Sequence, residues 1–423
     1  MLNNQNIFYK KKILIYGLGK SGLSTFKFLK KNNKIITYDD KIKSNKQEII
    51  SVKFDYIIIS PGIDIHKCSL SKFLKNNSKK IYTDLDIFYY HYKKNNKITI
   101  TGTNGKSTTA KILYEILKNH KMDVRLVGNI GNPILLEKKV THRTVFVIEA
   151  SSYQLEYSKL FKSNISLILN ISPDHLERHK TIKRYVTAKF KLIKNQTKKD
   201  FAILNTKNFY IKRELKSKNF LPKIIKIKKN VDINFLKKIN NQYFNTDGNR
   251  ENLTCILEVA KILNLKKNIL IKTLKKFKGL QYRQEIILQS KKLTIINDSK
   301  ATSFSSSVSL LKSLKNVYWI IGGQAKRGDK LLLSKKECKN FKAYIFGTNK
   351  NFFINKLRKL MDYESFLDLK GLIKKLLLEI KADKKLTHKI ILFSPSAASF
   401  DNFKNFEKRG EYFNQLIKKY INV

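Results

Sequence analysis

The segment KITITGTNGKST, residues 97–108, joins a short strand-like run to a glycine-containing turn and then to a helix expected from about 106 to 118. Glycines let backbone N–H groups approach a phosphate closely, and a helix N-terminus adds partial positive charge. Lys106 is able to reach β- and γ-phosphates, and Ser107 or Thr108 offers a hydroxyl to Mg²⁺. Ile100 stands where the strict pattern has its first glycine, so an ordinary strand–helix turn is the alternative. The register of strand, GxxGKST and helix favours a phosphate-binding loop.

Short β-rich runs alternate with longer helical runs on both sides of this segment, which predicts α/β domains with parallel sheets. The expected strands are 11–17, 35–40, 54–60, 97–102, 144–150, 165–172, 293–298, 317–323, 342–347 and 389–395. The length of 423 residues suggests about three domains. Because polar residues at 93–97 and the run 278–283 interrupt the pattern, we expect domains over 1–93, 94–281 and 282–423.

The composition excludes several classes of protein. Hydrophobic residues make up 42% of the chain, so it is globular rather than disordered. We expect a cytoplasmic protein, because no targeting segment and no apolar run of about 18 residues is present. Cys68, Cys255 and Cys338 are too scattered to suggest a disulfide framework or a metal pair.

The net charge of +55 raises the question of a nucleic-acid or anionic-membrane partner. The lysines are spread along the whole chain, whereas a dedicated binder concentrates its charge. This distribution favours drift of surface positions toward lysine, and we expect a monomer with no nucleic-acid partner. A nucleic-acid-binding ATPase stays as the distant alternative.

A second glycine motif, Gly17-x-Gly19-x-x-Gly22, is followed about twenty residues later by Asp39 and Asp40, in the form of a dinucleotide fingerprint. A plain tight turn and a nucleotide other than NAD are the alternatives. We favour a diphosphate-bearing substrate, which would use the same helix N-terminus.

Three further residues follow buried-type strands or lie on a nearby helix. Glu149 ends the strand 144–150, where a carboxylate either holds Mg²⁺ or caps the next helix. His175, after the strand 165–172, is a metal ligand, an acid or base, or a structural histidine. Lys189 shares an apolar stripe of a helix expected near 181–196, where snorkelling to the surface competes with a special role.

The last third repeats the pattern of strands followed by polar or small residues. The segments are INDSKAT (296–302), IIGGQAKRGDK (320–330) and SPSAASFDNFKNFEKRG (394–410). The first places Asp298, Lys300 and Thr302 just past a strand, and the second is a strand-to-glycine turn followed by Lys326. The small residues and phenylalanines of the third either shape a pocket or form a loop-to-helix connection.

Taken together, these segments resemble the Mur ligases, the ATP-dependent amide ligases that build the peptide of peptidoglycan. GLGKSGLS, SPGI (60–63), GTNGKST, EASSYQLE, NDSKAT and the segment 394–410 carry the resemblance over the whole chain. It implies a Rossmann-like N-terminal domain, a central ATPase-type phosphate-loop domain and a Rossmann-like C-terminal domain. The last domain lacks the Asp-Asn-Pro-Arg element of relatives that add a diamino acid.

The resemblance implies a cytoplasmic step of peptidoglycan synthesis in which ATP and two Mg²⁺ ions support ligation of D-glutamate to UDP-N-acetylmuramoyl-L-alanine through an acyl phosphate. A related ligase for a different amino acid is the nearest alternative. Two positions depart from the family pattern. Gly248 and Tyr282 stand where the family commonly has histidines beside its ATP site.

The resemblance also assigns roles by position. Catalysis falls to Lys106, Glu149, His175 and Lys189. Of the two Mg²⁺ ions, one would be held by Ser107 and Glu149, and the other by His175 and a carbamylated Lys189. ATP binding falls to Gly102, Thr103, Asn104, Gly105, Lys106, Ser107, Thr108, Asn249, Asn252, Arg283, Asp298 and Lys300. The UDP substrate falls to Lys20, Ser21, Asp40, Lys41, Gly62, Asn129 and Ser151, and D-glutamate to Thr302, Lys326, Ser399 and Phe406.

Overall fold

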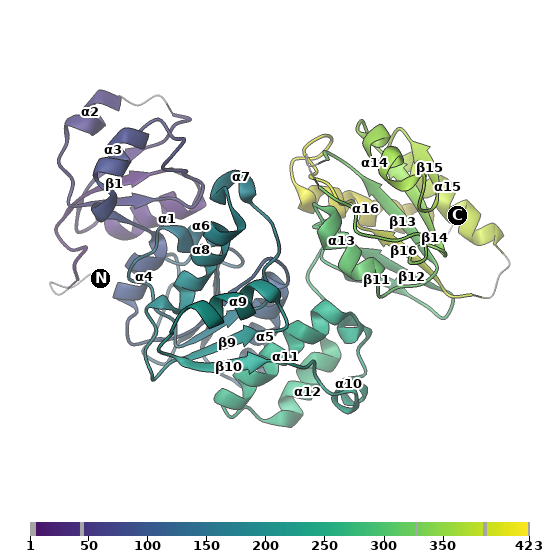
Figure 1. The fold of residues 1–423 in the computed structure, drawn as a ribbon, viewed down its shortest axis with the longest axis horizontal. Coiled ribbons are helices and arrows are strands. Elements are labelled where there is room, and N and C mark those ends of the chain that lie inside the picture. Colours follow the sequence, from purple (N-terminus) through teal and green to yellow (C-terminus); the bar gives the residue numbers. More distant parts are fainter. Residues whose placement is uncertain (1–5, 43–45, 326–328, 384–386, 422–423) are drawn as a thin grey trace. The chain divides into compact units, whose positions relative to one another are not determined.

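A computed structural model describes residues 6–42, 46–325, 329–383 and 387–421. The chain divides into two compact units, one made of Met1–Ile239 with Glu251–Lys275, the other of Asn240–Arg250 with Lys276–Val423. The first unit contains two sheets and the second unit contains one (Figure 1). Each unit is described by itself below.

The first sheet has the strand order β2-β1-β3-β4, and its pairings are parallel. Its strands are β1 (Lys12–Tyr16), β2 (Lys34–Tyr38), β3 (Tyr56–Ile59) and β4 (Ile81–Tyr82), with helices α1 (Lys20–Leu29), α2 (Lys46–Ser51), α3 (Ser71–Asn76) and α4 (Asp84–His91) and the 3₁₀ turn η1 (Ser78–Lys80). A Cβ atom on Gly22 would lie 1.8 Å from the carbonyl oxygen of Gly17, so the start of α1 against this turn requires glycine.

The second sheet has the order β10-β9-β8-β5-β7-β6, and all its pairings are parallel. Its strands are β5 (Asn96–Thr101), β6 (Val124–Gly128), β7 (Val145–Glu149), β8 (Ile165–Ile168), β9 (Phe201–Asn205) and β10 (Lys223–Ile227). Its helices are α5 (Lys106–Asn119), α6 (Ser152–Glu156), α7 (Leu176–His179), α8 (Ile182–Lys194), α9 (Phe209–Ser217), α10 (Ile233–Ile239), α11 (Asp247–Ile262) and α12 (Lys267–Lys276). Because β5 lies between β7 and β8, the loops that follow these three strands meet at one edge.

The first two sheets share a hydrophobic core. Phe8 and Ile13 from the first sheet region and Phe88 of α4 belong to the same buried cluster as Phe146 and Ile148 of β7. The expected boundary near residue 93 falls between α4 and β5, in the chain segment that joins these two packed sheets.

The third sheet has the order β11-β12-β16-β13-β14-β15, with only the β11–β12 pair antiparallel among its described pairings. Its strands are β11 (Glu285–Gln289), β12 (Leu293–Asn297), β13 (Val317–Gly322), β14 (Phe341–Phe346), β15 (Asp362–Phe366) and β16 (Lys389–Phe393). The helices are α13 (Phe304–Leu311), α14 (Lys350–Leu357), α15 (Leu369–Ala382) and α16 (Phe406–Tyr420), and the 3₁₀ turn η2 (Gln242–Asn245) belongs to the same unit.

Successive residues of the central strands enter different cores, as expected for a sheet covered on both faces. Trp319 and Ile321 pack in one cluster, while Ile320 and Phe393 pack in the other with Phe413 of α16. The α/β class and the three predicted sheets are therefore confirmed, and the antiparallel edge strand β11 is an addition that the sequence pattern did not predict. Among the described helices, none has the length and apolar character needed to span a bilayer.

Candidate active site

The loop between β5 and α5 has the strand–turn–helix geometry predicted for it. Gly105 has φ +81°, and a Cβ atom there would lie 2.4 Å from the side-chain nitrogen of Asn252. Asn170, after β8, holds the loop through two hydrogen bonds to the backbone of Asn104. Its side chain accepts one from the Asn104 N–H (2.8 Å) and donates one to the Asn104 carbonyl (3.1 Å). The Lys106 ammonium donates to the Thr103 carbonyl at 2.8 Å. The loop is thus pre-formed, with Lys106 folded back over it.

Glu149 ends β7 beside this loop, in register with Ile100 of β5. Its Oε1 accepts a hydrogen bond from the Asn129 side chain (2.8 Å), while its buried Oε2 lacks any hydrogen-bond partner within the described part of the chain. A buried carboxylate oxygen without a hydrogen-bond partner lowers the stability of the fold unless a ligand supplies the missing contact. The capping alternative is wrong, because Ser151 caps α6 by accepting from the Gln154 N–H.

Lys189 lies on α8 and is only 1% exposed, so the snorkelling interpretation is wrong. Its Nζ donates to the Gly102 carbonyl at 2.7 Å and sits 4.5 Å from the centre of the Tyr185 ring. Burial, and then the nearby Lys106 cation, holds the pKa of Lys189 well below its ordinary value. The share of neutral amine, which is the form that reacts with CO₂, is therefore larger than in an exposed lysine.

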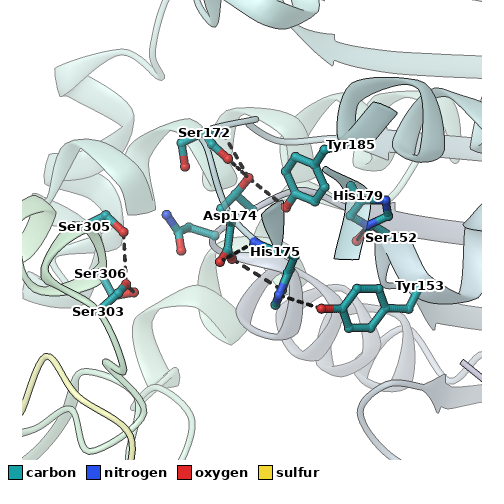
Figure 2. Close-up of polar contacts among 12 residues, drawn as sticks. Ser152, Tyr153, Ser172, Asp174, His175, His179, Tyr185, Ser303, Ser305 and Ser306 are labelled. Carbon is teal, nitrogen blue, oxygen red and sulfur yellow. Dashed lines mark hydrogen bonds and ion pairs between the residues drawn. The ribbon is translucent and has the colours of Figure 1, made fainter. Parts of the chain in front are cut away.

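His175 follows β8 with φ +53° and begins a short turn of helix, α7. Figure 2 shows its ring beside Tyr153, whose hydroxyl forms a 3.0 Å hydrogen bond with Nδ1, while Nε2 lies 3.4 Å from a carboxylate oxygen of Asp174. In the described residues, no group of three or more histidine, cysteine, aspartate or glutamate side chains is placed to hold a metal ion. A metal site at His175 would therefore include ligands other than histidine, cysteine, aspartate and glutamate side chains.

His179 is a buried neighbour that the sequence analysis missed. Its Nε2 shares a 3.0 Å hydrogen bond with the Ser152 hydroxyl, and burial, followed by the Arg178 charge, lowers its pKa to about 4. The ring is consequently neutral near pH 7 and serves as a fixed hydrogen-bonding group between α6 and α7.

The residues predicted to contact the UDP substrate lie at the ends of strands in the first unit. Lys20 and Ser21 begin α1; Asp40 and Lys41 follow β2; Gly62 follows β3; Asn129 and Ser151 follow β6 and β7. The side chains of the last two are engaged within the protein, on Glu149 and on the N-terminus of α6.

Asp39 and Asp40 have different roles in this region. Asp39 accepts from the Leu18 N–H (2.6 Å) and thereby holds the glycine turn. Asp40 accepts from the Tyr16 hydroxyl (2.7 Å) and from Ser69 (2.5 Å), neither of which the sequence analysis singled out. Buried Asp84, also missed, faces Ser21, and burial raises its pKa to about 6.

The second unit holds the remaining predicted ATP residues apart from Asn252. Asn249 donates to the Tyr243 carbonyl (2.7 Å) and to the Gln284 side chain (3.0 Å). Asp298 follows β12 and accepts from the Gln284 N–H (3.1 Å) and from the Ser394 hydroxyl (3.0 Å). Burial raises the pKa of Asp298 to about 7.

A chain of hydroxyl groups extends from Asp298 into the loop after β16. Ser394 donates to the carboxylate, Ser307 of α13 lies 2.7 Å from Ser394, and Ser396 lies 2.6 Å from Ser307. When Asp298 is ionised, it accepts a hydrogen bond from the Ser394 hydroxyl, so that Ser307 donates to Ser394 and Ser396 donates to Ser307. These serines were missed because nothing in their spacing shows that α13 and the end of β16 meet.

The predicted D-glutamate residues that the structure describes belong to the second unit. Phe406 begins α16, and its ring faces cations assigned to ATP: the Lys300 ammonium at 4.1 Å and the Arg283 guanidinium at 5.8 Å. Ser399 is buried and Thr302 is half-buried. Lys326 lies outside the described residues.

The two departures from the family pattern have different surroundings. Tyr282 adopts φ +60°, and its carbonyl accepts from the Lys300 N–H at 2.9 Å. A Cβ atom on Gly410 would lie 2.4 Å from the Tyr282 ring, so the ring packs directly on the backbone of α16. Gly248 lies in the first turn of α11.

The parallel sheets, the phosphate loop and the buried carboxylate at the next strand end define the chain as a multidomain α/β protein of the phosphate-loop class. The family model for the Mur ligase middle domain matches residues 100–270. The UDP-N-acetylmuramoylalanine–D-glutamate ligase of Rickettsia bellii is 34% identical over 97% of this chain and 98% of its own, and that of Francisella philomiragia is 32% identical over 96% of each. The chain therefore belongs to the Mur ligase family.

Solved structures agree with this assignment at the level of the fold. UDP-N-acetylmuramate–alanine ligase of Thermotoga maritima has a TM-score of 0.57 at 15% identity, covering 97% of this chain and 99% of its own. The MurF ligase of the same organism, solved in complex with ADP, has a TM-score of 0.56 at 16% identity, covering 98% and 99%.

Proposed function

We propose that this protein ligates D-glutamate to UDP-N-acetylmuramoyl-L-alanine in the cytoplasm, at the expense of ATP. The similarity to ligases of that name over nearly the full length supports the choice of substrates. The observation that carries the chemistry is the buried Oε2 of Glu149, which has no hydrogen-bond partner among the described residues and lies beside a pre-formed phosphate loop.

The first step is phosphoryl transfer. The alanyl carboxylate attacks the γ-phosphorus of ATP, an O–P bond forms, the bond to the β-phosphate oxygen breaks, and ADP leaves. Lys106 and the N–H groups at the start of α5 neutralise charge that develops on the phosphate oxygens. The pre-formed loop reduces the reorganisation needed at that moment, because Asn170 already fixes its backbone.

The second step is acyl transfer. The amine of D-glutamate attacks the carbonyl carbon of the acyl phosphate, a C–N bond forms, and inorganic phosphate departs while the nitrogen loses a proton. Water must be excluded during this step, since it would hydrolyse the intermediate.

The donor set fits magnesium, a hard cation that prefers oxygen ligands. Glu149 Oε2 and the buried Ser107 hydroxyl would hold one ion, and His175 with a carbamate on Lys189 would hold the other. When bound, the ions supply positive charge to the phosphate oxygens. Carbamylation joins the neutral Lys189 amine to CO₂ with release of a proton, and converts the amine into an anionic oxygen donor.

We assign the amino-acid pocket to the loops of the third sheet. Thr302 and Ser399 would donate to carboxylate oxygens, Lys326 would supply charge, and Phe406 would form a wall. The contact of Phe406 with Lys300 supports a further function for the ring, which is to orient a cation assigned to ATP.

A phosphate-release assay with UDP-N-acetylmuramoyl-L-alanine and a panel of amino acids tests the proposal. We expect release that requires ATP, Mg²⁺ and D-glutamate together, with the L isomer inactive. Preference for another amino acid would support the related-ligase alternative. Stimulation by nucleic acid without the small substrates would instead support the nucleic-acid-binding ATPase.

A further inference from the structure

Arg178 is a buried link between the two sheets of the first unit. Its side chain is 8% exposed, and its Nε donates to Glu156 of α6 at 2.9 Å. Its Nη2 donates to the backbone carbonyl of Ile63, a residue of the loop after β3, at 2.5 Å. The guanidinium carbon also lies 5.4 Å from the centre of the Tyr153 ring and 5.5 Å from that of Tyr157.

The two ends of this link lie beside different parts of the proposed site. Arg178 belongs to α7, whose N-terminal residue follows His175 directly. Ile63 follows Gly62, which is predicted to contact the diphosphate–sugar region of the substrate. The Arg178 guanidinium therefore fixes the distance between the His175 turn and the loop that contains Gly62.

The loop that Arg178 holds is also tied to the glycine turn of β1. The Ile63 N–H donates to the Ser60 carbonyl at 3.0 Å, and the Ser60 hydroxyl donates to the Gly17 carbonyl at 2.6 Å. A Cβ atom on Gly62 would meet no described atom within 4 Å, so the protein itself imposes no steric need for glycine there. Open space above a glycine backbone suits the close approach of a ligand.

We propose that Arg178 is a positioning residue for the UDP substrate, and that it holds the 60–63 loop at a fixed distance from the His175 turn. The inference rests on the proposed function, and it states how that site selects its substrate by the length between diphosphate and carboxylate. A nucleotide diphosphate held at the loop would then place its distant carboxylate at the phosphate loop of β5. Nucleotide sugars of a different length between these groups would be rejected.

The planar shape of arginine explains why this residue type is needed. A guanidinium donates in two directions at once while its faces contact aromatic rings, whereas an ammonium is a point charge. Lysine at this position is able to pair with Glu156 or with the Ile63 carbonyl, and loses the second contact.

Arg178→Met and Arg178→Lys test the proposal, with Arg184→Met and Arg184→Lys as matched controls on the exposed face of α8. For Arg178→Met we expect the KM for UDP-N-acetylmuramoyl-L-alanine to rise about ten- to thirty-fold. The KM values for ATP and D-glutamate should stay within about twofold and kcat within about threefold, while Arg178→Lys should give an intermediate KM. The Arg184 variants should match the parent.

Calorimetric binding of UDP-N-acetylmuramoyl-L-alanine without ATP gives a second readout that does not depend on turnover, and we expect the same order of affinities. A role confined to stability would lower the melting temperature and kcat and leave the KM values unchanged, which would overturn the inference. An active parent with an unchanged KM in both Arg178 variants would overturn it too, and leave the proposed function intact. A parent that neither turns over nor binds the UDP compound would overturn the proposed function, and the inference with it.

Discussion

At the scale of single residues, the structure distinguishes two lysines among the many of this chain. Lys106 folds over its loop, Lys189 is buried beneath it, and the charge of Lys106 contributes to lowering the pKa of Lys189. We expect Lys106→Ala to reduce turnover by about 10²–10³-fold without loss of the fold, because a preorganised charge at the transition state is removed. Steady-state phosphate release and circular dichroism measure the two effects.

Lys111→Ala is the control for Lys106, since Lys111 lies on the same helix and pairs with Glu115 at the surface at 3.3 Å. It should behave as the parent. Activity of Lys106→Ala within a few-fold of the parent would contradict the assignment of the phosphate loop.

Lys189 should carry a carbamate in the Mg²⁺-bound enzyme. Its lowered pKa leaves more neutral amine at pH 7–8 than an exposed lysine has, and only the neutral amine adds CO₂. We expect Lys189→Ala to be nearly inactive and to regain some turnover in acetate or propionate, whose carboxylates supply the missing oxygen donors. Exposed Lys194 of the same helix gives the control variant. A ¹³CO₂-labelled enzyme without a carbamate carbon signal in nuclear magnetic resonance would refute the prediction.

At the scale of elements, one carboxylate joins helix α4 to the segment after α6. Oδ1 of Asp86 accepts from the Ser158 hydroxyl (2.8 Å) and from the N–H groups of Lys159, Leu160 and Phe161 at 2.9, 2.7 and 3.1 Å. Oδ2 accepts from the Thr83 N–H at 2.9 Å and completes the capping box of α4. The first sheet is thus joined to the second through a fully buried carboxyl group.

Asp86→Asn should lower the free energy of unfolding by about 2–4 kcal/mol, because an amide has one acceptor oxygen and turns an NH₂ group toward N–H donors. Urea unfolding monitored by far-ultraviolet circular dichroism measures this change in the free energy of unfolding. Asp55→Asn is the control, since exposed Asp55 accepts a single N–H from Lys12 at 2.8 Å. Equal stabilities of the two variants would show that the buried contacts contribute nothing beyond a surface one.

At the scale of the whole molecule, the net charge of +55 gives a long-range field that attracts anionic substrates. We expect kcat/KM for the UDP substrate to fall by about fivefold or more between about 50 mM and about 500 mM KCl, because salt screens this attraction. The kcat at saturation should change less, because it does not depend on the rate at which enzyme and substrate meet. A kcat/KM that stays constant across this range would show that the charge has no influence on substrate capture.

The sequence by itself determined the α/β class, the phosphate loop and the family. Each of these depends on local order along the chain, such as a strand, glycines, Lys106 and then a helix, and the structure confirms that order. The strand-end position of Glu149 was likewise readable, because the apolar run of β7 ends directly before it, whereas His175 lies several residues beyond β8, which ends at Ile168.

Only the tertiary structure decided which side chains meet. It buried Lys189 against the Gly102 carbonyl, where its position on a helical stripe had left snorkelling and a special role as alternatives. It directed Asn129 onto Glu149, and it joined Arg178 to Ile63 across 115 positions of the sequence. The physical reason is that hydrogen bonds and burial between distant segments depend on how sheets pack, and local patterns of residues carry no record of that packing.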